Sequence, residues 1–256
     1  MKKGIFFTHQ GWTDIINCLG LIGHYSKSYE KLVILVREDS KPFMDFYLNQ
    51  FNNVYPQYEK KENLDNYHFV IPDGYDILFH GYHDQFRKDQ YKLSFHSSRG
   101  FFVKKFYEAY GITFETKIED FSLVRDFELE NIAYKNFIKS LDGDYILYHE
   151  DKYTPGGFTG IELPKNIIES EKSINLNLIT DNFFIYSEIL QKSKEIHLVD
   201  SVWASVIYLI DCKYKLFENI PIFIYPFRSR EGGLLNYAND KNIEPKHPDN
   251  WIIKKV

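Results

Sequence analysis

The sequence predicts an α/β fold made of two parallel-sheet halves of similar size. Apolar runs of strand type alternate with segments whose apolar residues recur at helical spacing, which is the pattern of a doubly wound parallel sheet. The segment Lys31–Val36 is apolar after its first residue, as in a strand covered on both faces. Because the alternation starts again in the second half, we expect domains at 1–125 and 126–256.

Composition limits the class of protein. The chain has 256 residues, 44% of them hydrophobic, which is enough for one large core or two smaller ones. Its net charge of −5 supplies no basic excess for a phosphate backbone, so nucleic acid is not the expected partner. The two cysteines, Cys18 and Cys212, lie far apart in apolar helical settings, which favours buried reduced thiols over a disulfide or a zinc site.

The chain shows no signal peptide and no apolar run of membrane-spanning length. We therefore expect a cytoplasmic protein without a transmembrane segment. Peripheral contact with a membrane remains compatible with the sequence.

The first half begins with a strand, a polar loop and a helix. Ile5–Phe7 are apolar, four polar or small residues end at Gly11, and apolar residues then recur at helical spacing up to Ile22. Further elements are expected as strands at 31–36, 53–55, 68–71 and 76–79 and helices at 41–51 and 101–110, the last ended by Gly111. The charged segment 112–126 lacks periodicity and is the predicted linker.

The second half repeats the alternation. We expect helices at 128–140, 181–192 and 202–210 and strands at 145–148, 174–179, 195–199, 214–217 and 222–225. The apolar side of the first helix is predicted to contain Leu129, Ile132, Ala133, Phe137 and Ile138. The third helix is apolar nearly all round and should be buried. The glycine-rich segment 153–160 is either a substrate-covering loop or an ordinary surface loop.

The loop after the first strand carries more polar side chains than a connector needs: His9, Gln10, Thr13 and Asp14. Ligands of open α/β sheets bind where such loops leave the carboxyl ends of strands. Asp14 is a candidate general base that could take a proton from an acceptor hydroxyl. Alternatively, Thr13 or Asp14 caps the helix. His80 and Tyr82, just past a later strand, are expected to line the same cleft.

The second half has polar residues at comparable places. Asp200 and Ser201 precede the apolar helix, where they either cap it or bind a phosphate together with its free N–H groups. His149 follows a strand and could hydrogen-bond a phosphate or a ribose, or belong to a solvated turn. Arg228 and Arg230 suit bidentate phosphate contacts. No sequence motif for a metal site or a Ser-His-Asp triad is present, so no metal is expected.

These two loops resemble those of the GT-B glycosyltransferases, and within them the heptosyltransferase-type (glycosyltransferase family 9-like) enzymes. That family opens with a strand, a Gly-x-Gly-Asp loop and a helix, where this chain has Gly11-Trp12-Thr13-Asp14. Its second half has an Asp-Ser-Gly turn near the donor phosphates, where this chain has Asp200-Ser201-Val202. Thr13 and Val202 thus replace two family glycines. The resemblance implies two Rossmann-like domains facing a cleft, with Asp14 as catalytic base.

The predicted function is transfer of a sugar from a nucleotide-sugar to an acceptor hydroxyl. The first half would be the acceptor side, with Gln10, Gly11 and Thr13 near Asp14, and the second half would hold the donor. No metal or cofactor is expected, because a helix dipole and arginines can neutralise the leaving phosphate. One alternative is a nucleotide-sugar hydrolase or epimerase in which Asp14 or His9 activates water. The other is a non-catalytic nucleotide- or carbohydrate-binding relative.

Overall fold

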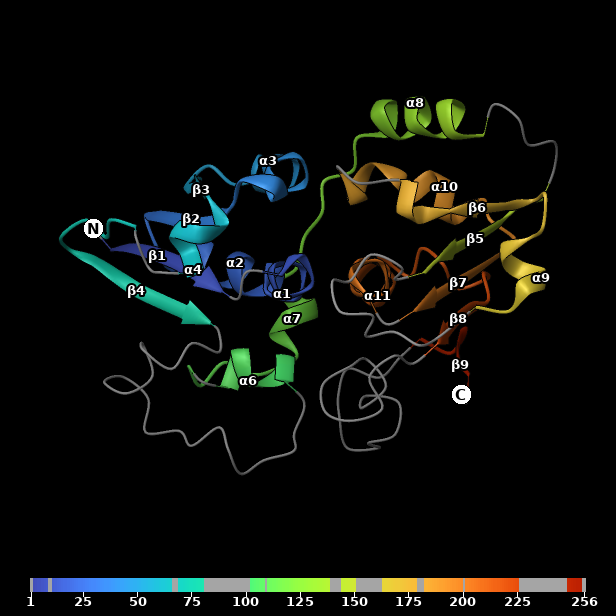
Figure 1. Cartoon of the computed structure of the whole chain (residues 1–256). Helices are drawn as coiled ribbons and strands as arrows, with labels where there is room; N and C mark the ends of the chain where they lie inside the picture. The colour runs from blue at the N-terminus through green and yellow to red at the C-terminus, as the bar shows by residue number, and fades with distance from the viewer. Residues whose placement is uncertain are drawn as a thin grey trace. The chain divides into compact units, whose positions relative to one another are not determined.

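The computed structural model describes residues 2–8, 11–65, 69–80, 102–108, 110–138, 144–150, 163–178, 182–199, 201–225 and 248–254. The chain divides into two compact units, Met1–Val124 and Arg125–Val256. Each unit contains a parallel β-sheet accompanied by helices (Figure 1), which confirms the predicted fold class.

The first unit has a sheet with strand order β3-β2-β1-β4. Its elements are β1 (Lys3–Thr8), α1 (Trp12–Asn17), α2 (Leu19–Ser26), β2 (Lys31–Arg37), η1 (Glu38–Ser40), α3 (Lys41–Leu48), β3 (Val54–Glu59), α4 (Lys61–Asp65), β4 (Tyr75–His80), α6 (Phe102–Glu108) and α7 (Thr116–Glu119). Strands β2 and β3 extend from one side of β1, and β4 pairs with its other side. The strand order therefore reverses between β1 and β4, which is where open α/β sheets bind ligands.

Both faces of this sheet are covered, because successive side chains of a strand point to opposite faces. On one face, Leu64 of α4 packs into a cluster with Ile5, Phe7, Leu35 and Phe79. On the other face, Tyr25 of α2 lies against Phe6, with ring centroids 6.1 Å apart. The sheet that positions the polar loops at its strand ends is thus packed on both faces.

The segment 112–126, predicted to be a linker from its lack of periodicity, is for the most part packed into the first unit. It contains α7 and buries three large apolar side chains: Phe114, Phe121 and Leu123. A Cβ atom added to Gly20 of α2 would lie 2.5 Å from the backbone oxygen of Lys117. Because only glycine allows this approach, the segment packs directly on the backbone of α2, and it belongs to the first unit as far as Val124.

The second unit has a sheet with strand order β6-β5-β7-β8-β9. Its elements are α8 (Phe127–Phe137), β5 (Ile146–His149), α9 (Lys165–Ile168), β6 (Ser173–Asn175), η2 (Leu176–Leu178), η3 (Phe183–Tyr186), α10 (Ser187–Gln191), β7 (Glu195–Val199), α11 (Val202–Tyr214), β8 (Ile222–Tyr225) and β9 (Trp251–Ile253). Strand β6 pairs with one side of β5 and β7 with the other. The strand order therefore reverses between β5 and β7.

Helix α11 is buried along nearly its whole length, as its apolar sequence predicts. Trp203 meets Phe183 of η3 edge-on, with ring centroids 5.1 Å apart. Elsewhere in this unit, Ile167 of α9 packs with Tyr148 of β5 and Val199 of β7. The start of α11 is therefore fixed by the packing of Trp203 on η3.

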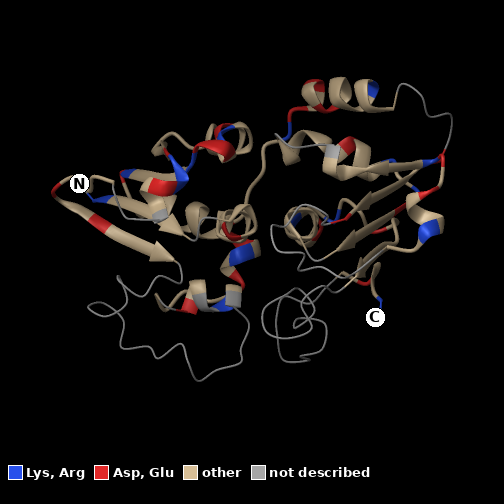
Figure 2. Cartoon of the chain, in the orientation of Figure 1, with Lys and Arg blue, Asp and Glu red and all other residues tan. Residues whose placement is uncertain are grey.

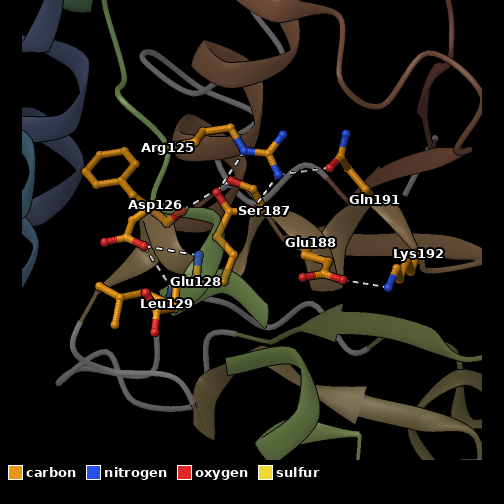
Figure 3. A network of polar contacts seen from close by, with 10 residues as sticks. Arg125, Asp126, Glu128, Leu129, Ser187, Glu188, Gln191 and Lys192 are labelled. Carbon is orange, nitrogen blue, oxygen red and sulfur yellow. Dashed lines mark hydrogen bonds and ion pairs between the residues drawn. The ribbon is translucent and has the colours of Figure 1, made fainter. Parts of the chain in front are cut away.

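Helix α8 turns only part of its predicted apolar side inward: Ala133 is buried and Phe137 meets Tyr186, but two other members of that side are exposed. Leu129 and Ile132 are 41% and 47% exposed, whereas Glu130 is 1% exposed. Arg125 explains this, because its Nε donates to Glu130 Oε1 at 2.7 Å and its Nη2 donates to Gln191 Oε1 of α10 at 3.1 Å (Figure 3). The ion pair of Arg125 with Glu130 and the hydrogen bond of Arg125 to α10, neither of which the periodicity of the sequence indicates, thus set the orientation of α8.

Two strand predictions are wrong, and a third has the right start but is too long. Of the predicted strand 68–71, the described residues 69–71 are irregular, although Phe69 and Ile71 pack against the core of the first unit. The predicted strand 214–217 begins in the last residue of α11 and continues into a turn. The predicted strand 174–179 ends at Asn175, where η2 begins. Strand β9 has no counterpart in the prediction.

Basic and acidic side chains are interspersed along the described part of both units (Figure 2). Within the same residues, none of the helices has the length and apolar character needed to cross a membrane.

Candidate functional site

Asp14 lies in the first turn of α1, directly after the carboxyl end of β1. Gly11, and neither Thr13 nor Asp14, is the N-cap residue, and its carbonyl oxygen accepts the amide of Asp14 at 3.1 Å. A Cβ atom on Gly11 would lie only 2.9 Å from Asp14 Oδ2. The glycine therefore leaves the space next to it to the carboxylate of Asp14.

Thr8, the last residue of β1, links the ends of the two strands at which the order reverses. Its Oγ1 donates to the backbone oxygen of His80 at 2.5 Å and lies 3.4 Å from Cys18 Sγ. Burial raises the pKa of the Cys18 thiol to about 12. The thiol is therefore neutral and serves the packing below Asp14, and it is not a nucleophile.

The prediction that His80 lines a cleft is wrong, because His80 is the last residue of β4 and lies in the core. Its side chain is 1% exposed. Nδ1 donates to the carbonyl oxygen of Phe106, Nε2 lies 2.9 Å from the Tyr25 hydroxyl, and the ring stacks on Tyr110 at 4.1 Å between centroids. Burial lowers the pKa of His80 to about 3, although the bond to Phe106 acts in the opposite direction. This histidine is a neutral part of the core.

The second unit brings together two residues predicted for a phosphate site. Ser201 Oγ lies 2.8 Å from His149 Nδ1, so a hydrogen bond joins the start of α11 to the end of β5. The two residues are 52 positions apart in sequence and meet where the strand order reverses. His149 is 9% exposed, so its ring is held by the fold.

Ser201 is the N-cap residue of α11 in extended backbone conformation, yet its side chain makes no capping hydrogen bond. Its hydroxyl points to the imidazole of His149 instead. The predicted alternative, in which Ser201 caps the helix, is therefore wrong. The positive end of the α11 dipole and a polar hydroxyl–imidazole pair thus lie together, which is an arrangement suited to an anion.

Several predicted site residues lie outside the described residues: His9, Gln10, Tyr82, Asp200, Arg228, Arg230 and the segment 153–160. Among the residues that the structure does describe, no group of three or more His, Cys, Asp or Glu side chains is placed to hold a metal ion.

Two polar residues below Asp14 were not anticipated from the sequence. Lys117 is fully buried, and its Nζ donates to Asn17 Oδ1 at 2.7 Å. No pattern indicates this contact, because a lysine in a charged segment is ordinarily solvated.

No family model and no curated protein matches this chain. Its structure is similar to the glycosyl transferase family 9 crystal structure from Veillonella parvula DSM 2008, with 11% identity, 99% of this chain and 87% of that chain covered, and a TM-score of 0.58. It is also similar to the ADP-heptose lps heptosyltransferase II of E. coli, with 12% identity, 100% and 91% coverage, and a TM-score of 0.54. The chain therefore has the two-sheet α/β fold of the glycosyltransferase family 9 and heptosyltransferase structures, as the resemblance of its two loops predicts.

Proposed function

We propose that this chain is a glycosyltransferase that moves a sugar from a nucleotide-sugar to the hydroxyl group of an acceptor. The observation that carries the proposal is the complementary chemistry at the two strand-order reversals. The first has a carboxylate, Asp14, and the second has the Ser201–His149 pair at the start of α11. The shared fold supports the proposal without specifying the sugar.

The second unit would bind the diphosphate of the donor. The N-terminal amides of α11 favour an anion through their partial positive charge, and the hydroxyl and imidazole supply hydrogen bonds. Arg228 and Arg230 are proposed to contact the diphosphate, and Asp200 is proposed to lie near another part of the donor. Helix and side chains together would stabilise the leaving diphosphate without a metal.

The first unit would bind the acceptor. A carboxylate repels a diphosphate but accepts a proton from a hydroxyl within hydrogen-bond reach. Asp14 is the proposed base, and Gly11 and Thr13 would lie beside the acceptor. His9, Gln10 and Tyr82 remain proposed neighbours, whereas the buried His80 is not one of them.

In the reaction, Asp14 takes the proton of the acceptor hydroxyl while the hydroxyl oxygen forms a bond to the anomeric carbon of the sugar. The bond between that carbon and the phosphate oxygen breaks, and the electron pair leaves with the nucleoside diphosphate.

Cys18 and Cys212 are free thiols, which supports a reducing compartment, the cytoplasm, as the place of this reaction.

The experiment has a binding arm and a transfer arm. Calorimetric titration with ADP, UDP and GDP should give binding by at least one of them, weakened about tenfold by Ser201→Ala, which removes a hydrogen bond to a charged group. Asp14→Asn should bind the same nucleotide as tightly as the wild type, yet transfer sugar from the corresponding nucleotide-sugars, among them ADP-heptose, only at a small residual rate. Full transfer by Asp14→Asn would contradict the assignment.

The same assays separate the other functions. Release of free sugar in the absence of an acceptor, at the rate seen with one, would indicate a nucleotide-sugar hydrolase. Binding with neither release nor transfer over a broad donor and acceptor panel would indicate a non-catalytic relative.

A further inference from the structure

Lys117 of α7 is a cation with no exposed surface, placed directly below α1. Its Nζ donates to Asn17 Oδ1 at 2.7 Å and lies 5.7 Å from the centroid of the Phe114 ring. Lysines are rarely fully buried, because the ammonium group loses its hydration. The burial of this ammonium group is therefore unfavourable by itself, and its hydrogen bond to Asn17 connects it to α1.

Asn17 passes this contact on to the turn that carries Asp14. Asn17 is 4% exposed, and its Nδ2 donates to the backbone oxygen of Thr13 at 2.9 Å. That oxygen and the amide N–H of Asp14 belong to one peptide group, and the N–H donates to Gly11 O at 3.1 Å. The peptide group from which Asp14 departs is thus held at both of its polar ends.

Lys117 and Asp14 also act on a common neighbour. Burial is the main cause that raises the pKa of the Cys18 thiol; the charge of Asp14 raises it further, and the charge of Lys117 lowers it. Both charges are therefore within electrostatic reach of one buried sulfur atom. Opposite charges attract more strongly in such a region than in water, because the effective dielectric constant is lower.

We propose that Lys117 is a positioning residue for Asp14: its buried ammonium group holds Asn17, and Asn17 holds the peptide group that presents the carboxylate. The inference rests on the proposed role of Asp14 as the base. Removing Lys117 takes this donor away from Asn17 Oδ1 and frees the Asn17 side chain to turn, so the first turn of α1 loses the bond at Thr13.

The first test needs no substrate. Lys117→Met keeps the length of the side chain and removes its charge and donor. Hydrogen exchange followed by mass spectrometry should be about tenfold faster in peptides that cover 11–18, in keeping with the loss of one hydrogen bond to a charged group. Peptides from β2 and α3 should exchange as in the wild type.

Phe121→Leu is the matched control. Phe121 is 1% exposed in the same segment and stacks on Tyr47, with ring centroids 6.0 Å apart. The variant should lower the melting temperature but leave exchange in 11–18 unchanged relative to the other peptides. If Lys117→Met does not fold, Lys117→Met combined with Asn17→Leu replaces both partners by apolar groups, which buried sites tolerate better.

The second test uses transfer from ADP-heptose and the other nucleotide-sugars of the panel. Lys117→Met should lower kcat about 10²-fold and leave KM for the donor unchanged, because a misplaced base slows the chemical step. In the Asp14→Asn background it should have no further effect, since Lys117 acts through Asp14.

The outcomes are distinguishable. Unchanged exchange in 11–18, or equal acceleration in Phe121→Leu, would overturn the positioning role, as would an additive loss of kcat in the double variant. Full transfer by Asp14→Asn would instead refute the proposed base, and the exchange measurement would then decide alone whether Lys117 holds the turn.

Discussion

Ser201 Oγ and His149 Nδ1 lie 2.8 Å apart, so the residue that begins α11 directs its hydroxyl to the neighbouring strand β5 and not to its own helix. This contact ties together the two loops at which the sheet of the second unit reverses its strand order. It has consequences for stability that can be separated from those for binding.

The first prediction concerns this pair. Ser201→Ala and His149→Phe should each lower the free energy of unfolding, and the double variant should lose less than their sum by about 0.5–1.5 kcal/mol, the net worth of one hydrogen bond. Urea denaturation of the four proteins measures this coupling. Ser205→Ala, one turn further along α11, serves as control and should be additive with His149→Phe. Additive losses for Ser201 and His149 would mean that the bond does not form in solution.

The second prediction concerns pH. Burial lowers the pKa of His80 to about 3, whereas an unfolded histidine has a pKa of about 6.5. Because the unfolded state binds the proton first, His80 contributes stability above pH 6.5 that is lost as the pH falls towards 3, by about 1.4 kcal/mol per unit. Urea denaturation between pH 7 and 4 should show this loss. In His80→Gln the free energy of unfolding should fall less steeply with falling pH, by about 1.4 kcal/mol per pH unit, the equivalent of one proton. An unchanged slope would contradict the buried neutral state.

The third prediction concerns the contact of α2 with the segment after α7. A Cβ atom on Gly23 would lie 2.0 Å from the backbone oxygen of Asp120, so Gly23→Ala must push two backbones apart. We expect a loss of about 1–3 kcal/mol in the free energy of unfolding. Ser26→Ala, in the last turn of the same helix, should cost less, because it removes one hydroxyl and creates no clash. Equal losses would show that the close approach is absent.

The fourth prediction concerns the end of α11. Lys215 follows the helix with φ 54° and ψ 37°, a left-handed conformation that disfavours a side chain. Lys215→Gly should therefore raise the free energy of unfolding by about 0.5–1 kcal/mol, since the greater freedom of glycine in the unfolded state offsets part of the gain. Lys213→Gly, inside the helix, should have the opposite sign and lower it by about 1 kcal/mol. Thermal denaturation of both variants checks the prediction.

The fold could be predicted where burial alone shaped the sequence. Strand β2 is covered on both faces and is therefore apolar between its two end residues, which a single sequence reveals. Strand β9 has three residues, too few to show a period, and it forms through pairing with β8. Phe69 and Ile71 are apolar because they cover the core of the first unit, so an apolar run there indicated burial but not a strand.

The candidate site could be predicted only in part, for a related reason. Asp14, His149 and Ser201 stand at strand ends, and that position follows from local patterns. The bond between Ser201 and His149 depends on the strand order, which local patterns leave open. His80 also stands at a strand end, yet α6 and α2 enclose it. Lys117 is the reverse case. Its charge indicates a solvated residue, yet it is buried, because Gly20 of α2 lets the backbone at Lys117 approach closely.

The close packing of 112–124 on α2 also decides how this chain can be divided. A fragment that ended at residue 111, where the periodic part of the first half stops, would uncover the bare backbone of α2 at Gly20 and Gly23. It would also expose the apolar side chains that Phe114 and Phe121 cover, and would therefore tend to aggregate. A fragment that ends at Val124 keeps this cover, and it is the shorter piece to choose for nuclear magnetic resonance or for exchanging the first unit with that of another protein.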